Sequence, residues 1–330
     1  MFKETPPAPN TINHDWLSEA EVKAFGLLKD KYKKAAINMT QFEKVAGYGE
    51  ERVRRDKERV ERKKRKIQEL GTGPTKKAQL LEALLTEQIE LSEWFGGNTF
   101  TIVPAEFDDL IHGVDLALEI EDDEGVKHLA LGIDVTSSPM SVRKKLKETK
   151  ERLSVGELTS MEYFHSEDHN PDFYGTMGNI PWVVIGTDGK TIKELGELWM
   201  SAYGLAKLRR DSKQPPLSPE AEEHQKKSAR EARQNLADHR VQTLMLEEMK
   251  MQLTVFHKFA IEKSEAYKAT GNTELAEKLA QVANKLESTL GLVGLILSSK
   301  ETPSIDDVFK NQEDFVFQSL AEALNDFNNL

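Results

Sequence analysis

The chain has no cysteine among its 330 residues. Disulfide bonds and thiolate metal ligands are therefore excluded, and this composition is compatible with a reducing compartment. Long hydrophobic runs are also missing. The most apolar late stretch, residues 290–297, is far shorter than the roughly 20 residues that span a bilayer, and residues 1–9 show no apolar core of a secretory signal. We expect a cytoplasmic protein with no membrane partner.

An excess of positive charge is absent as well. Lysine and arginine total 45 against 56 aspartates and glutamates, which gives a net charge of −11. This balance excludes a globally basic nucleic-acid-binding surface, so any contact with nucleic acid must use local basic patches. The 330 residues exceed what a single core usually occupies, and we expect two or three units.

Residues 1–74 form the first predicted unit, a charged helical N-terminal region. Within it, residues 52–66 carry ten basic and three acidic side chains and almost no apolar stripe. Such a pattern predicts a solvated helix with charge pairs between successive turns. The helix either touches phosphates, with Arg54 and Lys63 as candidate contacts, or is a mixed-charge exposed or coiled-coil helix.

The second predicted unit, residues 75–213, is an α/β core. Its apolar periodicities, interrupted by glycine, proline and polar turns, predict alternating helices and strands. The expected helices cover residues 75–95, 142–153 and 191–203, and the expected strands cover residues 99–103, 114–120, 129–135, 161–165 and 180–186.

The third predicted unit, residues 220–330, follows a stiff proline-rich linker at residues 214–219 and reads as helix throughout. Its helices have apolar faces of their own but no motif with recognisable chemistry. We expect a packing module or a module that binds a protein partner.

Two aspartates, Asp115 and Asp134, stand inside apolar runs of strand length. A carboxylate in such a run is costly to bury unless something pairs with it. Two carboxylates that converge at one end of a sheet suit hard Mg²⁺ or Mn²⁺ ions, which prefer oxygen ligands. Residues i and i+2 of a strand share a face, so Thr136 points into the same pocket as Asp134.

The order of elements in residues 75–213, with Asp115 near the start of the second strand and Asp134 on the third, resembles the PD-(D/E)xK nuclease superfamily. The resemblance implies an α+β fold with a restriction-endonuclease-like core, flanked by helical N- and C-terminal regions. It also implies metal-dependent phosphodiester hydrolysis, for which we favour DNA over RNA as the substrate.

The chain departs from the superfamily pattern at one position, because Thr136 stands where the superfamily has a lysine. In some members the lysine lies on the following helix, so the resemblance makes Lys144 and Lys145 its candidate replacements. The lysine would orient the attacking water or stabilise the developing charge. Thr136 would support that water by a hydrogen bond but carries no positive charge.

The resemblance also implies a glutamate from the first helix beside the two aspartates in the metal site. Glu87, Glu90 and Glu93 are candidates, and we favour Glu90. Asp108 and Asp109 are further acids close to the expected site, although Asp109 is also a plausible cap of a short helical turn. His112 is either a proton shuttle or a surface histidine.

The helix expected over residues 142–153 is strongly basic. Because it follows the strand that carries Asp134, its side chains Arg143, Lys147 and Lys150 are candidate phosphate contacts. A solvated helix face is the alternative interpretation.

Two other motifs have weaker interpretations. Residues 186–191 end in Gly-Lys-Thr but lack the first glycine of a phosphate-binding loop, so an Asp-Gly turn after a buried strand is expected. His165 and His169 are spaced as a metal pair would be on a helix, but a loop is expected there.

Two alternatives to an active nuclease remain from the sequence. The core could belong to a catalytically inactive relative that binds nucleic acid. Otherwise the chain is a helical interaction or structural protein in which the core is scaffold and the C-terminal helices bind a protein partner.

Overall fold

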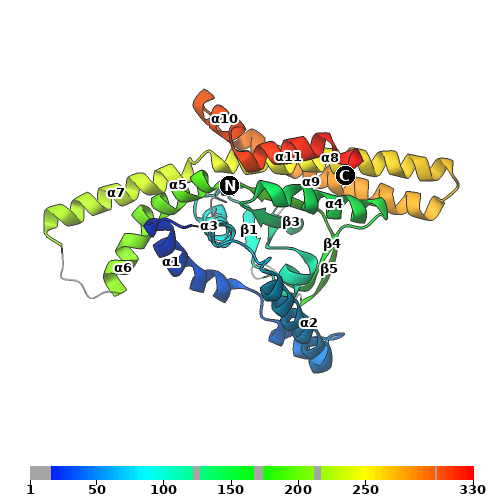
Figure 1. Cartoon of the computed structure of the whole chain (residues 1–330), viewed down its shortest axis with the longest axis horizontal. Coiled ribbons are helices and arrows are strands. Elements are labelled where there is room, and N and C mark those ends of the chain that lie inside the picture. Colours follow the sequence, from blue (N-terminus) through cyan, green and yellow to red (C-terminus); the bar gives the residue numbers. More distant parts are fainter. Residues whose placement is uncertain (1–15, 122–126, 167–173, 212–216, 302) are drawn as a thin grey trace, which may run out of the picture.

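The structure is a computed structural model that describes residues 16–121, 127–166, 174–211, 217–301 and 303–330. In these ranges many helices surround a small mixed sheet, so the fold is α+β, as the sequence predicts (Figure 1). The helices are α1 (Glu19–Ala35), α2 (Gly49–Leu70), α3 (Lys76–Leu91), α4 (Pro139–Ser154), α5 (Gly189–Trp199), α6 (Leu205–Asp211), α7 (Pro219–Ala237), α8 (Val241–Ala269), α9 (Thr273–Ser299), α10 (Ile305–Gln312) and α11 (Phe315–Asn325). Short helical turns are η1 (Met39–Lys44), η2 (Asp108–His112), η3 (Met200–Gly204) and η4 (Phe327–Asn329). The strands are β1 (Thr99–Ile102), β2 (Leu116–Glu121), β3 (Lys127–Thr136), β4 (Thr159–His165), β5 (Tyr174–Ile180) and β6 (Trp182–Gly186).

Four strands form the main sheet in the order β1, β2, β3, β6. The first three are an antiparallel meander, and β6 pairs in parallel with β3. Helix α4 lies in the connection between β3 and β6, because parallel neighbours need a long crossover. The register sets Asp134 opposite Val184 and Thr136 opposite Gly186.

The strand expected over residues 161–165 forms as β4, but it pairs with β5 in a separate two-stranded sheet. The fourth strand of the main sheet is β6 instead. All five residues of β6 are buried, as a strand covered on both faces requires, whereas most of β5 is not. The expected order of helix, meander, helix and strand therefore holds only when β6 is taken as the last strand.

Alternate residues of the sheet belong to two apolar clusters. Leu116 and Ile133 lie in a large cluster that also contains side chains of α1, α3, α4, α5, α8, α9 and α11. Ala117 and Val184 lie in a smaller cluster with side chains of η1, α2 and β4. Figure 1 shows α8, α9 and α11 as a long layer on one side of the sheet and α2 on the opposite side.

The C-terminal helices share the large cluster with the sheet, because its buried residues run from Ala24 to Phe327. Two side chains of α8 also bond the outer edge of β6. Gln252 accepts the backbone N–H of Val184 at 2.9 Å and donates to its carbonyl at 2.6 Å, and Glu248 accepts the N–H of Gly186 at 2.9 Å. These side chains of α8 thus occupy backbone hydrogen-bonding groups at the edge of β6 that would otherwise be open to pairing with another strand. The boundaries of the three units remain predictions.

Asp188 and Gly189 follow the buried strand β6, as expected, but they begin helix α5 and do not form a separate Asp-Gly turn: Asp188 caps α5 by accepting the backbone N–H groups of Lys190 and Thr191. His169 lies outside the described residues, so the expected loop at the histidine pair is not described. None of the described helices has the length and apolarity needed to cross a membrane.

Candidate active site

The two aspartates singled out in the sequence come together at one end of the sheet. The Asp115 backbone N–H donates to the carbonyl of Ile133 at 2.8 Å, and its carboxylate accepts the N–H of Val135 at 2.7 Å. Asp134 is 8% exposed, and its carboxyl group shares a hydrogen bond with that of Asp115. The antiparallel register of β2 and β3 creates this pair, because it sets Leu116, next to Asp115, opposite Ile133.

Lys145, on the second turn of α4, forms an ion pair with the Asp134 carboxylate and also donates to the carbonyl of Val135 at 3.3 Å. Lys144 does not reach the aspartates: its side chain is 81% exposed and lies 3.9 Å from Glu148. Of the two candidate lysines, the structure therefore brings only Lys145 to the site.

Glu82 of α3 is the helix glutamate that lies with the aspartates. Its half-buried side chain carries a carboxyl group whose pKa is raised well above its usual range, first by burial and then by the charges of Asp115, Asp109 and Asp134. Lys145 opposes that shift. The sequence contains a signal that Glu82 faces the sheet, since it shares its helix face with buried Ala78, Leu85 and Ile89 at positions i−4, i+3 and i+7.

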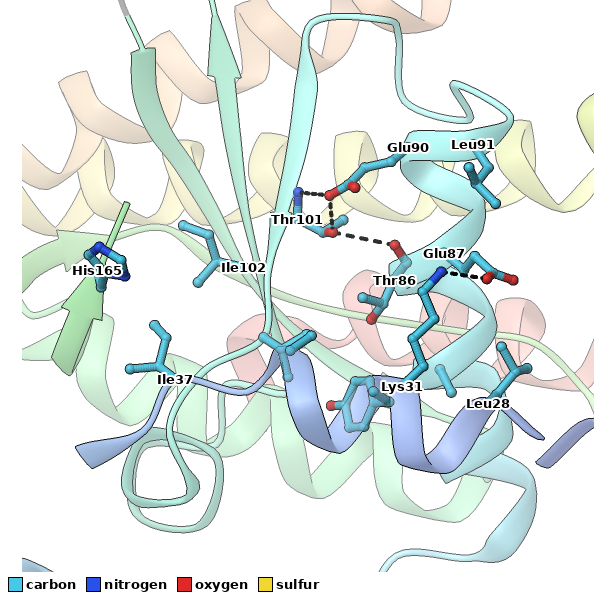
Figure 2. Close-up of a pocket in the computed structure, with 14 residues that line it drawn as sticks. Leu28, Lys31, Ile37, Thr86, Glu87, Glu90, Leu91, Thr101, Ile102 and His165 are labelled. Carbon is cyan, nitrogen blue, oxygen red and sulfur yellow. Dashed lines mark hydrogen bonds and ion pairs between the residues drawn. The ribbon is translucent and has the colours of Figure 1, made fainter. Parts of the chain in front are cut away.

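Glu90, favoured from the sequence, holds a different place (Figure 2). It accepts the backbone N–H and the hydroxyl of Thr101 at 2.9 and 2.5 Å, and so ties α3 to β1. Glu87, another candidate, pairs with Lys31 at 2.6 Å. Glu90 is eight residues beyond Glu82, about 12 Å along the helix axis. The structure therefore brings Glu82, and not the favoured Glu90, to the two aspartates.

Glu82, Asp115 and Asp134 together form what we call the carboxyl cluster, which holds more acidic than basic groups. Burial raises the pKa of Asp134 well above its usual range, Asp115 raises it further, and Lys145 opposes both effects. Burial also raises the pKa of Asp115, against the pull of Lys145 and of the Val135 N–H. Among the residues that the structure describes, Lys145 is the one ammonium group that faces these acids and Glu82, so the cluster favours a bound proton or an added cation.

Tyr32 of α1 covers one side of the cluster. Its hydroxyl donates to the backbone carbonyl of Asp115 at 3.2 Å, and burial followed by the charge of Glu82 raises its pKa well above 10. The pocket of ≈ 190 Å³ drawn in Figure 2, between α1, α3 and β1, is lined in part by Tyr32 and contains neither Asp115 nor Asp134. Sequence reasoning missed Tyr32, which precedes Asp115 by 83 residues.

The acids of η2 take different places. Asp108 is fully buried and accepts the backbone N–H groups of Glu162 and Tyr163 at 2.6 and 2.9 Å and a ring nitrogen of His112 at 2.8 Å. Asp108 therefore anchors β4 and holds His112 in place. Asp109 sits inside η2 rather than capping it. Its side chain reaches solvent, but the protein around its carboxyl group, followed by the charge of Asp115, raises its pKa to about 8.

Thr136 is 3% exposed, and its hydroxyl shapes the turn from β3 into α4. That oxygen accepts the backbone N–H of Ser138 at 3.1 Å and lies 2.7 Å from the hydroxyl of Ser141. Support of a catalytic water by Thr136 remains a prediction.

Some of the side chains expected to contact phosphate already bind other residues of the chain, and others are exposed to solvent. Arg143 pairs with Asp326 at 2.5 Å, and Lys150 donates to the carbonyl of Asn328 at 2.7 Å, so the C-terminal end of the chain takes up both. Arg54 is held by acids of its own helix, Glu51 and Glu58. Lys147 and Lys63 are exposed.

The side chains of the cluster partly meet the requirements of a divalent metal ion. Across the described ranges, no three acidic, histidine or cysteine side chains are already arranged to hold one. Lys145 bonds to Asp134, and the Val135 N–H bonds to Asp115. Mg²⁺ keeps several waters and often uses only one or two protein carboxylates together with substrate phosphate. Asp115 and Asp134 fit that requirement once Lys145 yields one carboxylate oxygen.

Comparisons with protein-family models, with curated proteins and with solved structures found no match to this chain.

Proposed function

We propose that the chain is a divergent, divalent-metal-dependent nuclease that hydrolyses phosphodiester bonds, and we favour DNA over RNA as its substrate. The observation that carries the proposal is the meeting of Glu82, Asp115, Asp134 and Lys145 at one end of the sheet. These residues come from four separate segments of the chain. An arrangement made only for stability would gain little from so many buried acids.

The topology supports the same proposal. Helix α3, the meander β1–β2–β3, helix α4 and the parallel strand β6 follow the order of elements implied by the resemblance to PD-(D/E)xK nucleases. A restriction-endonuclease-like core is therefore part of the proposal, with the hairpin β4–β5 inserted before β6.

Each residue has a role in this proposal. Asp115 and Asp134 would hold Mg²⁺ or Mn²⁺, and Glu82 would replace Glu90 as the acid from the first helix. The chemistry that such an ion would supply is polarisation of a phosphate oxygen and acidification of a water molecule. Lys145 carries the positive charge that Thr136 lacks, and would stabilise the charge that develops on the phosphate.

Location and partners belong to the same proposal. We place the activity in the cytoplasm, which cell fractionation tests. A protein partner on the C-terminal helices is not needed for the chemistry, because the four residues all lie between positions 82 and 145.

The proposal is tested with the purified full chain, supercoiled plasmid and a labelled single-stranded oligonucleotide, in Mg²⁺, Mn²⁺ or EDTA. We expect cleavage with either metal, none in EDTA, and loss of at least about 100-fold in rate in Asp134→Asn. Lys144→Ala, which changes an exposed side chain, serves as the matched control and keeps its activity. Cleavage that survives in Asp134→Asn would place the activity elsewhere. DNA binding without cleavage in any metal would favour the inactive, nucleic-acid-binding relative.

A further inference from the structure

One face of α2 carries a row of positive charge. Arg55, Arg59, Arg62 and Lys66 follow the spacing i, i+4, i+7 and i+11, which aligns them on one side of an α-helix over about 16 Å. All four are exposed. We call these four residues the α2 basic row.

Most of this charge is left uncompensated. Among the described residues, Arg55, Arg62 and Lys66 have no ion pair within 4 Å, and Arg59 has a single long contact of 3.4 Å to Asp56. Three other acids of α2 pair with basic side chains outside the row, since Glu51 and Glu58 bind Arg54, and Glu61 binds Lys64. In a chain of net charge −11, such a row is a local patch and not a reflection of the overall composition.

A cleft of ≈ 400 Å³ lies beside the row, lined by Arg52, Arg55, Arg59, Phe107 and His112 together with two acids. Both acids are already engaged: the hydroxyl of Tyr163 donates to Asp56 at 2.9 Å, and Glu162 pairs with Arg52. The guanidinium of Arg59 lies 5.0 Å from the centre of the Phe107 ring, which holds it at the mouth of the cleft.

The turn η2 joins this cleft to the carboxyl cluster. His112 lines the cleft, whereas Asp109, three residues earlier, borders Glu82 and Asp115. Lys64 of α2 also pairs at 2.9 Å with Glu106, just before η2. The segment from Glu106 to His112 therefore contacts both α2 and the candidate active site.

We propose that the α2 basic row binds the phosphate backbone of duplex DNA whose scissile bond lies at the carboxyl cluster. This inference rests on the proposed function and names the surface that holds its substrate. For every 3.4 Å of helix axis, duplex DNA carries one phosphate on each strand, so a row of about 16 Å laid along that axis spans four or five phosphates of one strand. Contacts of this kind position the DNA without reading its sequence.

The test measures binding of a fluorescein-labelled 20-base-pair duplex by fluorescence anisotropy, in EDTA and at several salt concentrations. The full chain is compared with Arg55→Ala/Arg62→Ala and with the control Lys227→Ala/Arg230→Ala, which removes the same charge from exposed positions of α7. Loss of two phosphate contacts lowers the slope of log K against log salt by about 1.8. Circular dichroism checks that both variants remain folded.

We expect several-fold weaker binding and the reduced salt slope only in the α2 variant, with two unrelated duplex sequences affected alike. Equal loss in both variants, or no loss in the α2 variant, would overturn the inference. Binding to anionic phosphatidylserine vesicles but not to the duplex would overturn it as well. The assay contains EDTA and measures binding alone, so failure of cleavage does not affect its outcome.

Discussion

Lys145 of α4 pairs with Asp134 of β3, whose carboxyl group in turn shares a hydrogen bond with Asp115. One ammonium group thus faces a group of acids whose pKa values are raised by burial. The ion pair places a positive charge beside the aspartates, which Thr136, two residues beyond Asp134, cannot supply. In the proposed function, Lys145 provides this charge.

The first prediction concerns the two neighbouring lysines. Lys145→Met keeps the aliphatic length but removes the charge, and we expect it to slow metal-dependent cleavage at least about 100-fold. Lys144→Met makes the same change on an 81% exposed side chain and should leave the rate within about twofold of the original. Initial rates on plasmid DNA measure both. Equal rates in the two variants would remove Lys145 from the mechanism.

The second prediction separates two glutamates of α3. Glu82→Gln removes a charge from the carboxyl cluster, so we expect weaker Mn²⁺ binding, by about tenfold or more. Glu90→Gln leaves the cluster unchanged and loses part of its hydrogen bonding to Thr101. Calorimetric titration of each variant measures the affinity. Weaker binding in Glu90→Gln alone would restore the assignment made from the sequence.

The third prediction concerns pH and the buried acid Glu248. Its side chain is 0% exposed, burial raises its pKa well above the usual range, and its Oε1 has no hydrogen-bond partner among the described residues. An acid with a raised folded-state pKa stabilises the fold below its unfolded pKa of about 4.3. That contribution is lost as the pH rises toward the folded-state value.

Glu248→Gln keeps an acceptor for the Gly186 N–H and cannot ionise. We therefore expect the difference in melting temperature between Glu248→Gln and the original chain to grow between pH 5 and pH 8, in favour of the variant. Thermal unfolding in EDTA measures it. The exposed substitution Glu262→Gln is the control. A constant difference across this pH range would contradict the burial argument.

The fourth prediction uses two glycines. A Cβ on Gly186 would lie 2.0 Å from the backbone oxygen of Thr136, in the parallel pairing of β3 and β6. Gly186→Ala should lower the free energy of unfolding by about 3 kcal/mol or more, because neither backbone can move aside. Gly294→Ala, in open space on α9, should raise it by up to about 1 kcal/mol. Urea unfolding gives both values, and similar values for the two variants would contradict the packing.

The local elements could be predicted from the sequence because each has its own apolar periodicity and is ended by glycine, proline or a polar turn. The helix expected at residues 75–95 and the strands at residues 99–103, 114–120 and 129–135 appear within a few residues of α3, β1, β2 and β3. The pairing of Asp115 with Asp134 was also predictable, because both stand in apolar runs across one turn.

What could not be predicted depends on rotation and on distant partners. The choice of Glu82 over Glu90 depends on which face of α3 meets the sheet. Tyr32 reaches the site from a helix far away in the chain. The choice of β6 over β4 as the fourth strand depends on burial on both faces, which a short apolar run does not specify.

The central claim is that Asp115 and Asp134 together hold a divalent cation. Titration of Mn²⁺ into the full chain, Asp115→Asn and Asp134→Asn, followed by calorimetry, tests it most directly. The account predicts binding of Mn²⁺ to the original chain and binding at least about tenfold weaker in each variant. Unchanged Mn²⁺ binding in both variants, or no binding by the original chain, would contradict it.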